Sequence, residues 1–301
     1  MKYFERKFGK DGAYAKYYLQ EPSQEIDNNR VYPTIVICPG GAYFWTSFRE
    51  DEMVALRFLA EGFNVVVVHY ATEGLKKMSQ LDANNIPQEK PISAYPNPLI
   101  TLASAVAYLK ENAEQFRVDL NFVVVGGFSA GGNVAAQLGS YWHESWLEDS
   151  LEKPKELFRP THLFLAYAAF DINPGGKVGE FNKVAYAASG EKYPSQELLD
   201  RINPIKQVSA LTPPSFIWHT MEDNLVPSVN ALSYCQELEK WNIPYELHLF
   251  NKGKHGLVFG DLRTGVKSSN QNAQVYKWVE LFLEWLAPIK TTRSGFYSPI
   301  D

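Results

Sequence analysis

The feature that most constrains the fold is the repeated alternation of short apolar runs with longer segments of helical spacing. Residues 63–70, FNVVVVHY, form a nearly continuous apolar run, as expected for a strand covered on both faces. Residues 50–62, EDEMVALRFLAEG, have helical spacing and end on glycine, a preferred helix stop. This alternation predicts an α/β fold in which a mainly parallel sheet is flanked by helices on both faces.

The same criteria predict the remaining elements. Further strands are expected at 13–20, 34–43, 121–126, 162–170, 215–220 and 245–250, and helices at 97–116, 130–140, 195–202, 227–241 and 271–286. Two segments, 71–96 and 171–200, carry glycine and proline without clear periodicity, and we expect them to form cap or lid excursions. No stretch resembles an interdomain linker, so we expect a single domain over residues 1–301.

The composition disfavours several classes of function. The 301 residues are 45% hydrophobic and 21% charged, and the formal net charge of −5 without a long basic run argues against a nucleic-acid partner. No run approaches the ~18 apolar residues of a membrane span, so no membrane association is expected. The N-terminal sequence MKYFERKFGKDGAY lacks the apolar core of a signal peptide. Cys38 and Cys235 make no disulfide framework, and together these features favour a cytoplasmic location.

A serine stands at the end of the strand predicted in the middle of the chain. In parallel α/β sheets, functional groups lie beyond the carboxyl ends of the strands. Residues 123–133, VVVGGFSAGGN, run from an apolar strand through glycines into a helix, and Ser129 lies between the glycines. This matches G-x-S-x-G, where a nucleophile occupies a turn too tight for side chains two positions away. The alternative is a glycine-rich connection or phosphate loop, although the Lys-Ser/Thr ending of a P-loop is missing.

An acid and a base follow two later strands. His255, in GKHG, can take the hydroxyl proton of Ser129 as a general base. Glu222 and Asp223 are adjacent candidates for the carboxylate that orients the imidazole; aspartate is the commoner residue in this role, and helix capping is the alternative for Asp223. The other histidines are expected to pack at strands or to lie in a loop: His69, His143, His162, His219 and His248.

The turn after the strand predicted at 34–43 can complete an oxyanion hole. Its glycines allow the backbone N–H of Gly41 or Ala42 to face the site, with the N–H of Ala130 as the other donor. A plain strand-ending turn is the alternative. The aromatic residues that follow are candidates for the walls of a small acyl pocket, or else pack beneath a loop: Tyr43, Phe44 and Trp45.

These motifs resemble those of bacterial α/β-hydrolase esterases, near the acetyl-xylan and feruloyl-type carbohydrate esterases and the hormone-sensitive-lipase-like carboxylesterases. The resemblance runs from about residue 30 to residue 287 and includes VICPGGAYFW, VVVGGFSAGGNVAAQLG and PYELHLFNKGKHGL. It implies an α/β-hydrolase fold with Ser129 as nucleophile, Asp223 as acid and His255 as base, in the chain order of that fold. Residues 39–42 read PGGA where the lipase-like members carry His-Gly-Gly-Gly, a variant that resembles the carbohydrate-esterase group.

The resemblance implies a serine carboxylesterase that hydrolyses short acyl esters, acetyl above all, of acetylated carbohydrates through an acyl-enzyme. The expected partner is a small-molecule ester, and no metal or organic cofactor is expected because no Cys/His spacing typical of ligands occurs. A serine peptidase, a lipase and a non-catalytic hydrolase-fold binding protein are the alternatives. A homo-oligomer is compatible with the sequence, which does not determine the assembly state.

Overall fold

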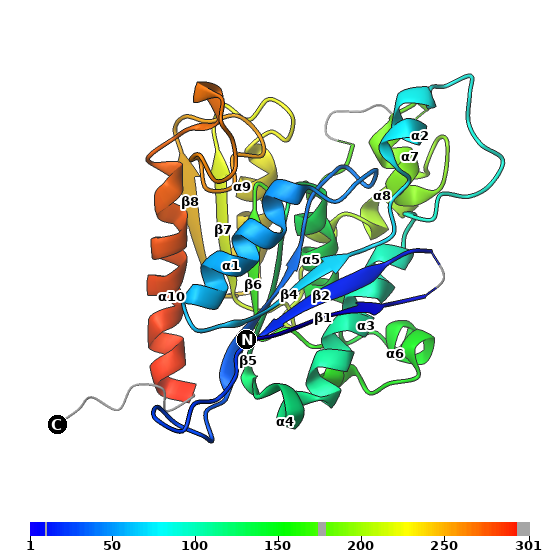
Figure 1. The fold of residues 1–301 in the computed structure, drawn as a ribbon. Coiled ribbons are helices and arrows are strands. Elements are labelled where there is room, and N and C mark those ends of the chain that lie inside the picture. The colour runs from blue at the N-terminus through cyan, green and yellow to red at the C-terminus, as the bar shows by residue number, and fades with distance from the viewer. Residues whose placement is uncertain (10, 174–178, 294–301) are drawn as a thin grey trace.

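The computed structural model describes residues 1–9, 11–173 and 179–293, which Figure 1 shows as a sheet wrapped by helices. The strands are β1 (Lys2–Lys7), β2 (Tyr14–Leu19), β3 (Tyr32–Cys38), β4 (Asn64–His69), β5 (Val118–Phe128), β6 (His162–Ala166), β7 (Ser215–Thr220) and β8 (Tyr245–Phe250). They form one sheet in the order β1-β2-β4-β3-β5-β6-β7-β8. The pairs β1/β2 and β2/β4 are antiparallel and all other neighbours are parallel, which confirms the predicted fold class.

Helices cover both faces of this sheet. They are α1 (Glu52–Ala60), α2 (Leu75–Gln80), α3 (Asn97–Glu111), α4 (Ala113–Phe116), α5 (Ser129–Tyr141), α6 (Ser145–Leu151), α7 (Lys183–Ser189), α8 (Gln196–Arg201), α9 (Val229–Lys240) and α10 (Trp278–Arg293). Helices α3, α5 and α9 share one hydrophobic core with the sheet, and α1 and α10 share the core on the opposite face. Among the described helices, none combines the length and the hydropathy that crossing a bilayer requires.

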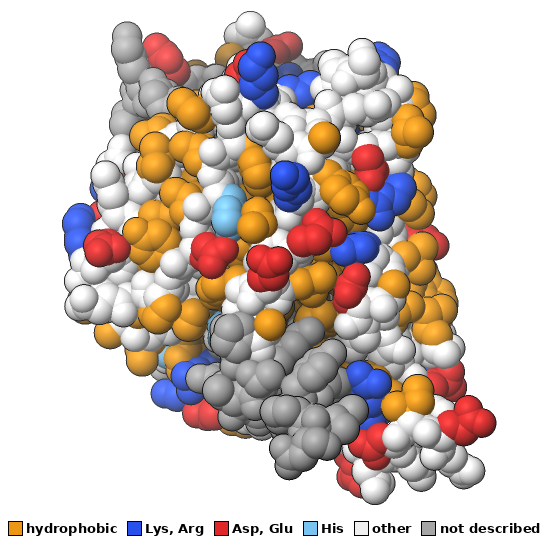
Figure 2. Space-filling model, turned by 90° about the vertical axis from the view of Figure 1, so that its left-hand side faces the viewer, with side chains coloured by type: hydrophobic (Ala, Val, Ile, Leu, Met, Phe, Trp, Pro, Cys, Tyr) orange, Lys and Arg blue, Asp and Glu red, His pale blue; other side chains and the backbone are white. Residues whose placement is uncertain are grey.

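The valine-rich strand β4 shows how the sequence builds these two cores. Successive side chains of a strand point to opposite faces of the sheet. Val66 and Val68 therefore belong to the core beneath α3 and α5, whereas Val65 and Val67 belong to the core beneath α1 and α10. On the face of the molecule that carries α10, hydrophobic, acidic and basic side chains are interspersed (Figure 2).

Several elements differ from the sequence prediction. The predicted helix 97–116 is divided into α3 and α4, the predicted strands 34–43 and 162–170 end at Cys38 and Ala166, and α6 was not predicted. Strand β1 was not predicted, because its residues, KYFERK, mix charged and aromatic side chains and most of them are exposed; pairing with β2 fixes it at the edge. Helix α10 begins at Trp278 instead of residue 271. The side chain of Asn272 accepts hydrogen bonds from the N–H groups of Gln274 and Val275, and these local bonds hold the chain in a turn before the helix.

The two segments expected to form caps pack against each other. The first contains α2 and the second contains α7 and most of α8, whereas its residues 174–178 lie outside the described residues. Ser93 Oγ donates a hydrogen bond to the carbonyl of Ala187 (2.8 Å), and Tyr95 N–H donates to the carbonyl of Ala188 (2.8 Å). In Figure 1, α2 and α7 lie close together at the end of the molecule where the parallel strands finish.

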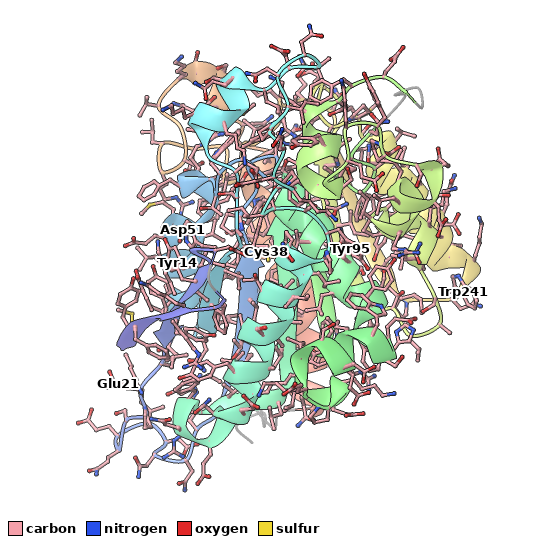
Figure 3. The ribbon with its side chains drawn as sticks, turned by 90° about the vertical axis from the view of Figure 1, so that its right-hand side faces the viewer. Tyr14, Glu21, Cys38, Asp51, Tyr95 and Trp241 are labelled. Carbon is pink, nitrogen blue, oxygen red and sulfur yellow. The ribbon has the colours of Figure 1, made fainter. Side chains whose placement is uncertain are left out.

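The register of the parallel strands brings several strand ends together. β7 and β8 pair from Ser215 with Tyr245 to Thr220 with Phe250, so the loops that follow them leave the sheet at the same level. Cys38, the last residue of β3, pairs with Gly127 near the end of β5 and lies in the interior of the molecule (Figure 3). The segments predicted to carry functional groups therefore start from one edge of the sheet.

Candidate active site

Ser129 lies on a sharp turn between β5 and α5. Its φ is 52°, a left-handed conformation that is uncommon for a residue with a side chain and stores strain. The flanking glycines are required by close packing: a Cβ on Gly131 would lie 2.1 Å from the carbonyl oxygen of Cys38, and a Cβ on Gly127 would lie 2.4 Å from the carbonyl oxygen of Gly131. The turn thus fits against the end of β3 only with glycine at both positions.

A hydrogen-bonded series connects the hydroxyl of Ser129 to a buried carboxylate. His255 Nε2 lies 2.8 Å from Ser129 Oγ, and His255 Nδ1 lies 2.6 Å from Asp223 Oδ2. Asp223 comes from the loop after β7 and His255 from the loop after β8. The structure therefore brings together the three side chains that the sequence analysis selected, across 126 positions between the serine and the histidine.

The second oxygen of Asp223 holds its own loop. Asp223 Oδ1 accepts hydrogen bonds from the backbone N–H groups of Leu225 (3.0 Å) and Val226 (2.9 Å). The residue does not cap α9, which begins at Val229 after Ser228. The neighbouring candidate, Glu222, is exposed and accepts a hydrogen bond from the N–H of Gly253, so Asp223 is the carboxylate at His255.

A second imidazole contacts the Asp223 carboxylate. His219, on β7, is fully buried; its Nε2 lies 3.3 Å from Asp223 Oδ2 and 2.9 Å from the carbonyl oxygen of Val226. Burial raises the pKa of Asp223, but hydrogen bonds from His219 and His255 more than offset this and hold the pKa well below its usual range. Asp223 is therefore an ionised acceptor that fixes the Nδ1–H tautomer of His255 and leaves Nε2 free to accept the serine proton.

The turn after β3 packs directly against Ser129. Gly41 has φ 132° and Ala42 has φ 52°, and a Cβ on Gly40 would lie 2.8 Å from Ser129 Cβ. Among the described residues, none accepts a hydrogen bond from the backbone N–H of Gly41, Ala42 or Ala130. Ala130 stands in the first turn of α5, where backbone N–H groups lack partners within the helix. These N–H groups are the donors expected of an oxyanion hole.

The three aromatic residues after this turn have different surroundings. Tyr43 and Phe44 expose 2% and 0% of their surface and belong to the hydrophobic core, where the hydroxyl of Tyr43 donates to Asn133 Oδ1 (2.8 Å). Trp45 remains partly exposed beside Gly41. Tyr43 and Phe44 therefore pack beneath the loop instead of lining an open pocket, and Trp45 is the member of the three with surface available to a ligand.

Sequence reasoning missed two residues beside the site. Glu50 is 3% exposed and was assigned to the start of a helix, and Tyr167 was assigned to the strand predicted at 162–170. In the structure the hydroxyl of Tyr167 donates to Glu50 Oε1 (2.7 Å), and its ring centroid lies 5.0 Å from that of His255. No periodicity or motif relates these positions, because their contact depends on how the loops after β3 and β6 meet.

The side chains that commonly bind metal ions are not clustered in the part of the chain that the structure describes. Across these residues no three His, Cys, Asp or Glu side chains are arranged to hold a metal ion. Cys38 and Cys235 are buried free thiols, and burial raises the pKa of Cys235 to about 12.

Known proteins share both sequence and fold with this chain. The sequence profile of the BD-FAE family matches residues 88–238, half of the chain. Endo-1,4-beta-xylanase B of Butyrivibrio fibrisolvens is 28% identical over 225 residues, which cover 74% of this chain and 32% of that protein. The chain thus spans about a third of the length of this curated relative.

Solved structures match over nearly the whole chain. The carboxylesterase Cest-2923 of Lactobacillus plantarum has a TM-score of 0.79 and 23% identity, with 96% of this chain and 98% of that one covered. The acetyl ester-xyloside bifunctional hydrolase of Caldicellulosiruptor lactoaceticus has a TM-score of 0.72 and 26% identity, with 92% and 88% covered. The chain belongs to the BD-FAE family and has the α/β-hydrolase fold of these solved structures.

Proposed function

We propose that this protein is a serine carboxylesterase that removes short acyl groups, acetyl above all, from acetylated carbohydrates. The observation that carries the proposal is the hydrogen-bonded series from Asp223 through His255 to the strained Ser129. The acyl group and the sugar are supported by the solved relative described as an acetyl ester-xyloside hydrolase. The PGGA sequence at residues 39–42, which resembles the carbohydrate-esterase group, supports the same substrate class.

In the first half of the reaction, Ser129 Oγ attacks the carbonyl carbon of the ester while His255 Nε2 takes the hydroxyl proton. The imidazolium that forms donates its Nδ1–H to the ionised Asp223. The negative charge on the carbonyl oxygen is received by backbone N–H groups of Ala130 and of Gly41 or Ala42. When the tetrahedral intermediate collapses, the C–O bond to the alcohol breaks and His255 returns the proton to that alcohol.

In the second half, water attacks the acyl-enzyme by the same route. His255 Nε2 takes a proton from the water as its oxygen bonds to the acyl carbon, and the same N–H groups receive the oxyanion. Collapse breaks the bond to Ser129 Oγ, which recovers its proton from His255. The carboxylic acid leaves, and the enzyme returns to its starting protonation state.

The segments 71–96 and 171–200 act in this proposal as a cap over the site. Their mutual hydrogen bonds through Ser93 and Tyr95 support a single covering unit, and their place at the end of the parallel strands supports a role in admitting substrate. Partly exposed Trp45 offers a ring on which a sugar can stack.

The proposal is tested with p-nitrophenyl acetate, butyrate, octanoate and laurate, alongside acetylated xylo-oligosaccharides with released acetate measured directly. We expect the highest kcat/KM on the shortest acyl group and acetate release from the sugar. A fluorophosphonate probe should label the enzyme, and mass spectrometry should place the adduct on Ser129.

The alternatives give different results in the same assays. Rates that rise with acyl length up to laurate would identify a lipase, and cleavage of aminoacyl p-nitroanilides in preference to esters would identify a peptidase. A folded protein that hydrolyses no activated ester and takes up no fluorophosphonate would be a binding protein, and the proposal would then be abandoned.

A further inference from the structure

Glu50 is a buried carboxylate whose two oxygens both receive hydrogen bonds at the edge of the site. Oε2 accepts from the backbone N–H of Gly40 (2.7 Å), and Oε1 accepts from the hydroxyl of Tyr167 (2.7 Å). Both partners donate, which matches an ionised carboxylate because that group can only accept. The mechanism above assigns Glu50 no role, although a buried charge is costly and needs a reason.

The hydrogen bond to Gly40 links Glu50 to the turn at residues 39–42, which carries two of the proposed oxyanion donors and is called the oxyanion turn below. Gly40 packs so closely on Ser129 that a Cβ there would lie 2.8 Å from Ser129 Cβ and 2.9 Å from Glu50 Oε2. The next residue, Gly41, is one of the two residues of this turn whose backbone N–H groups are available to an oxyanion, the other being Ala42. Holding the Gly40 N–H therefore fixes the orientation of the peptide that precedes these donors, and preorganised donors are the main source of oxyanion stabilisation.

The hydrogen bond to Tyr167 links Glu50 to the base. The Tyr167 ring stands edge-on to the His255 imidazole, with the centroids 5.0 Å apart and the planes at 70°. Burial raises the pKa of Glu50, whereas the hydrogen bonds from Tyr167 and Gly40 and the positive charge of a protonated His255 lower it. Tyr167 thus connects the Glu50 carboxylate to the imidazole, with its hydroxyl on one and its ring against the other. A negative charge near an imidazole favours the imidazolium.

We propose that Glu50 is a positioning residue of the esterase centre, which orients the oxyanion turn through Gly40 and stabilises the imidazolium of His255 during turnover. The inference rests on the proposed function. Other charged or titratable groups near His255 include Asp223 from the loop after β7, Tyr167 from the loop after β6, and Arg49, whose Nη2 would lie 3.2 Å from a Cβ on Gly256.

The charge and the hydrogen bonds of Glu50 can be separated by substitution. Glu50→Gln keeps the shape, and the amide can still accept from Gly40 N–H and donate to a Tyr167 hydroxyl turned to accept. Glu50→Ala removes both. The matched control is Asp51→Asn, which neutralises the adjacent buried carboxylate; Asp51 lies beside Tyr14 (Figure 3) and pairs with Lys16 instead of facing the site.

For Glu50→Gln we expect kcat on p-nitrophenyl acetate to fall by about 10- to 100-fold with KM changed less than about threefold. The acid limb of the kcat profile should move to lower pH, because loss of the negative charge makes protonation of His255 less favourable. Glu50→Ala should lose more kcat than Glu50→Gln. Asp51→Asn should leave the acid limb where it is in the wild-type enzyme.

Thermal unfolding distinguishes this role from a structural one. Burial raises the pKa of Glu50 in the folded state, so the folded protein favours the protonated carboxyl. The stability that Glu50 contributes is therefore fully present below its pKa in the unfolded chain, about 4.3, and is lost as the pH rises through its pKa in the folded protein. Glu50→Gln should therefore be at least as stable as the wild type at pH 8, despite its lower activity.

The inference is overturned if Glu50→Gln keeps wild-type kcat and acid limb. It is equally overturned if kcat and melting temperature fall together while the acid limb stays fixed, since that result describes a structural residue. Fluorophosphonate labelling of Ser129 in the wild-type enzyme is measured separately. If Ser129 of the wild-type enzyme is labelled but Glu50→Gln changes neither kcat nor the acid limb, only the inference about Glu50 is wrong. If the wild-type enzyme is not labelled and hydrolyses no ester, the proposed function itself is wrong.

Discussion

His219 Nε2 lies 3.3 Å from Asp223 Oδ2, the same oxygen that faces His255 Nδ1 at 2.6 Å. The Asp223 carboxylate that contacts His255 is thus itself held by a buried imidazole from the preceding strand. His219 Nδ1 is buried without a hydrogen-bond partner among the described residues, so Nε2 is the ring nitrogen that faces the Asp223 carboxylate and the carbonyl of Val226. Since His219 touches neither the serine nor the substrate in our proposal, its effect should pass through Asp223.

Replacing His219 tests this positioning. His219→Met fills the space without a donor, and we expect kcat to fall by about tenfold and unfolding free energy by about 1–3 kcal/mol, because the carbonyl of Val226 and the carboxylate lose a partner. His219→Gln places an amide donor near the former Nε2 and should recover most of the rate. Steady-state kinetics and urea unfolding measure both; equal rates for the two variants would contradict the role.

Removing the Ser129 hydroxyl should abolish turnover without loss of the fold. For Ser129→Ala we expect kcat on p-nitrophenyl acetate to fall by about 10⁴-fold or more, with an unchanged circular dichroism spectrum. Ser129→Gly should be equally inactive but about 1 kcal/mol more stable than Ser129→Ala, because glycine adopts a φ of 52° without strain. A glycine variant that melts below the alanine variant would contradict this account of the turn.

Replacing Asp223 by asparagine should affect both rate and acid stability. We expect kcat to fall by about 10⁴-fold, because the amide no longer fixes the imidazole tautomer or stabilises its charge. The depressed pKa of Asp223 gives stability that is present above the unfolded value of about 3.9 and lost as the pH falls through the folded value. The difference in unfolding free energy between wild type and Asp223→Asn should therefore narrow below about pH 4, as measured by urea titrations across pH.

The glycines of α5 should differ in their tolerance of a methyl group. A Cβ on Gly131 meets the backbone carbonyl of Cys38 at 2.1 Å, so Gly131→Ala should cost about 3 kcal/mol or more. A Cβ on Gly139 meets the end of the Leu163 side chain at 2.5 Å, which can move, so Gly139→Ala should cost about 1 kcal/mol. Thermal unfolding compares them, and equal costs would show that the tight turn is not what requires Gly131.

The sheet strands and the three hydrogen-bonded side chains of the candidate site could be predicted from the sequence for related reasons. β4 carries four consecutive valines, which few structures other than a covered strand accommodate. Ser129, Asp223 and His255 each follow a strand of the parallel part of the sheet, so the rule that sites lie beyond strand ends selects them. Strand β1 offers no comparable signal, since its place depends on pairing with β2.

The supporting contacts were not accessible in this way. Glu50 and Tyr167 are 117 positions apart and meet through two loops whose paths the local sequence does not determine. His219 was expected to pack within a strand, and it does, but its bond to Asp223 follows from the turn at residues 220–223. Tyr43 looked available for a pocket because it follows the oxyanion turn, yet a φ of 66° directs the chain so that its ring is buried.

The parallel register between β7 and β8 also determines how Asp223 and His255 are placed relative to each other. Asp223 and His255 leave the sheet three and five residues after the paired ends Thr220 and Phe250. A slip of one residue between these strands would displace the imidazole along the strand axis by about 3.3 Å, more than the length of either of its hydrogen bonds. Molecules with such a slip would therefore lack activity even if the rest of the chain were well packed. The fraction of active molecules after refolding then depends on how often β7 and β8 pair in the correct register.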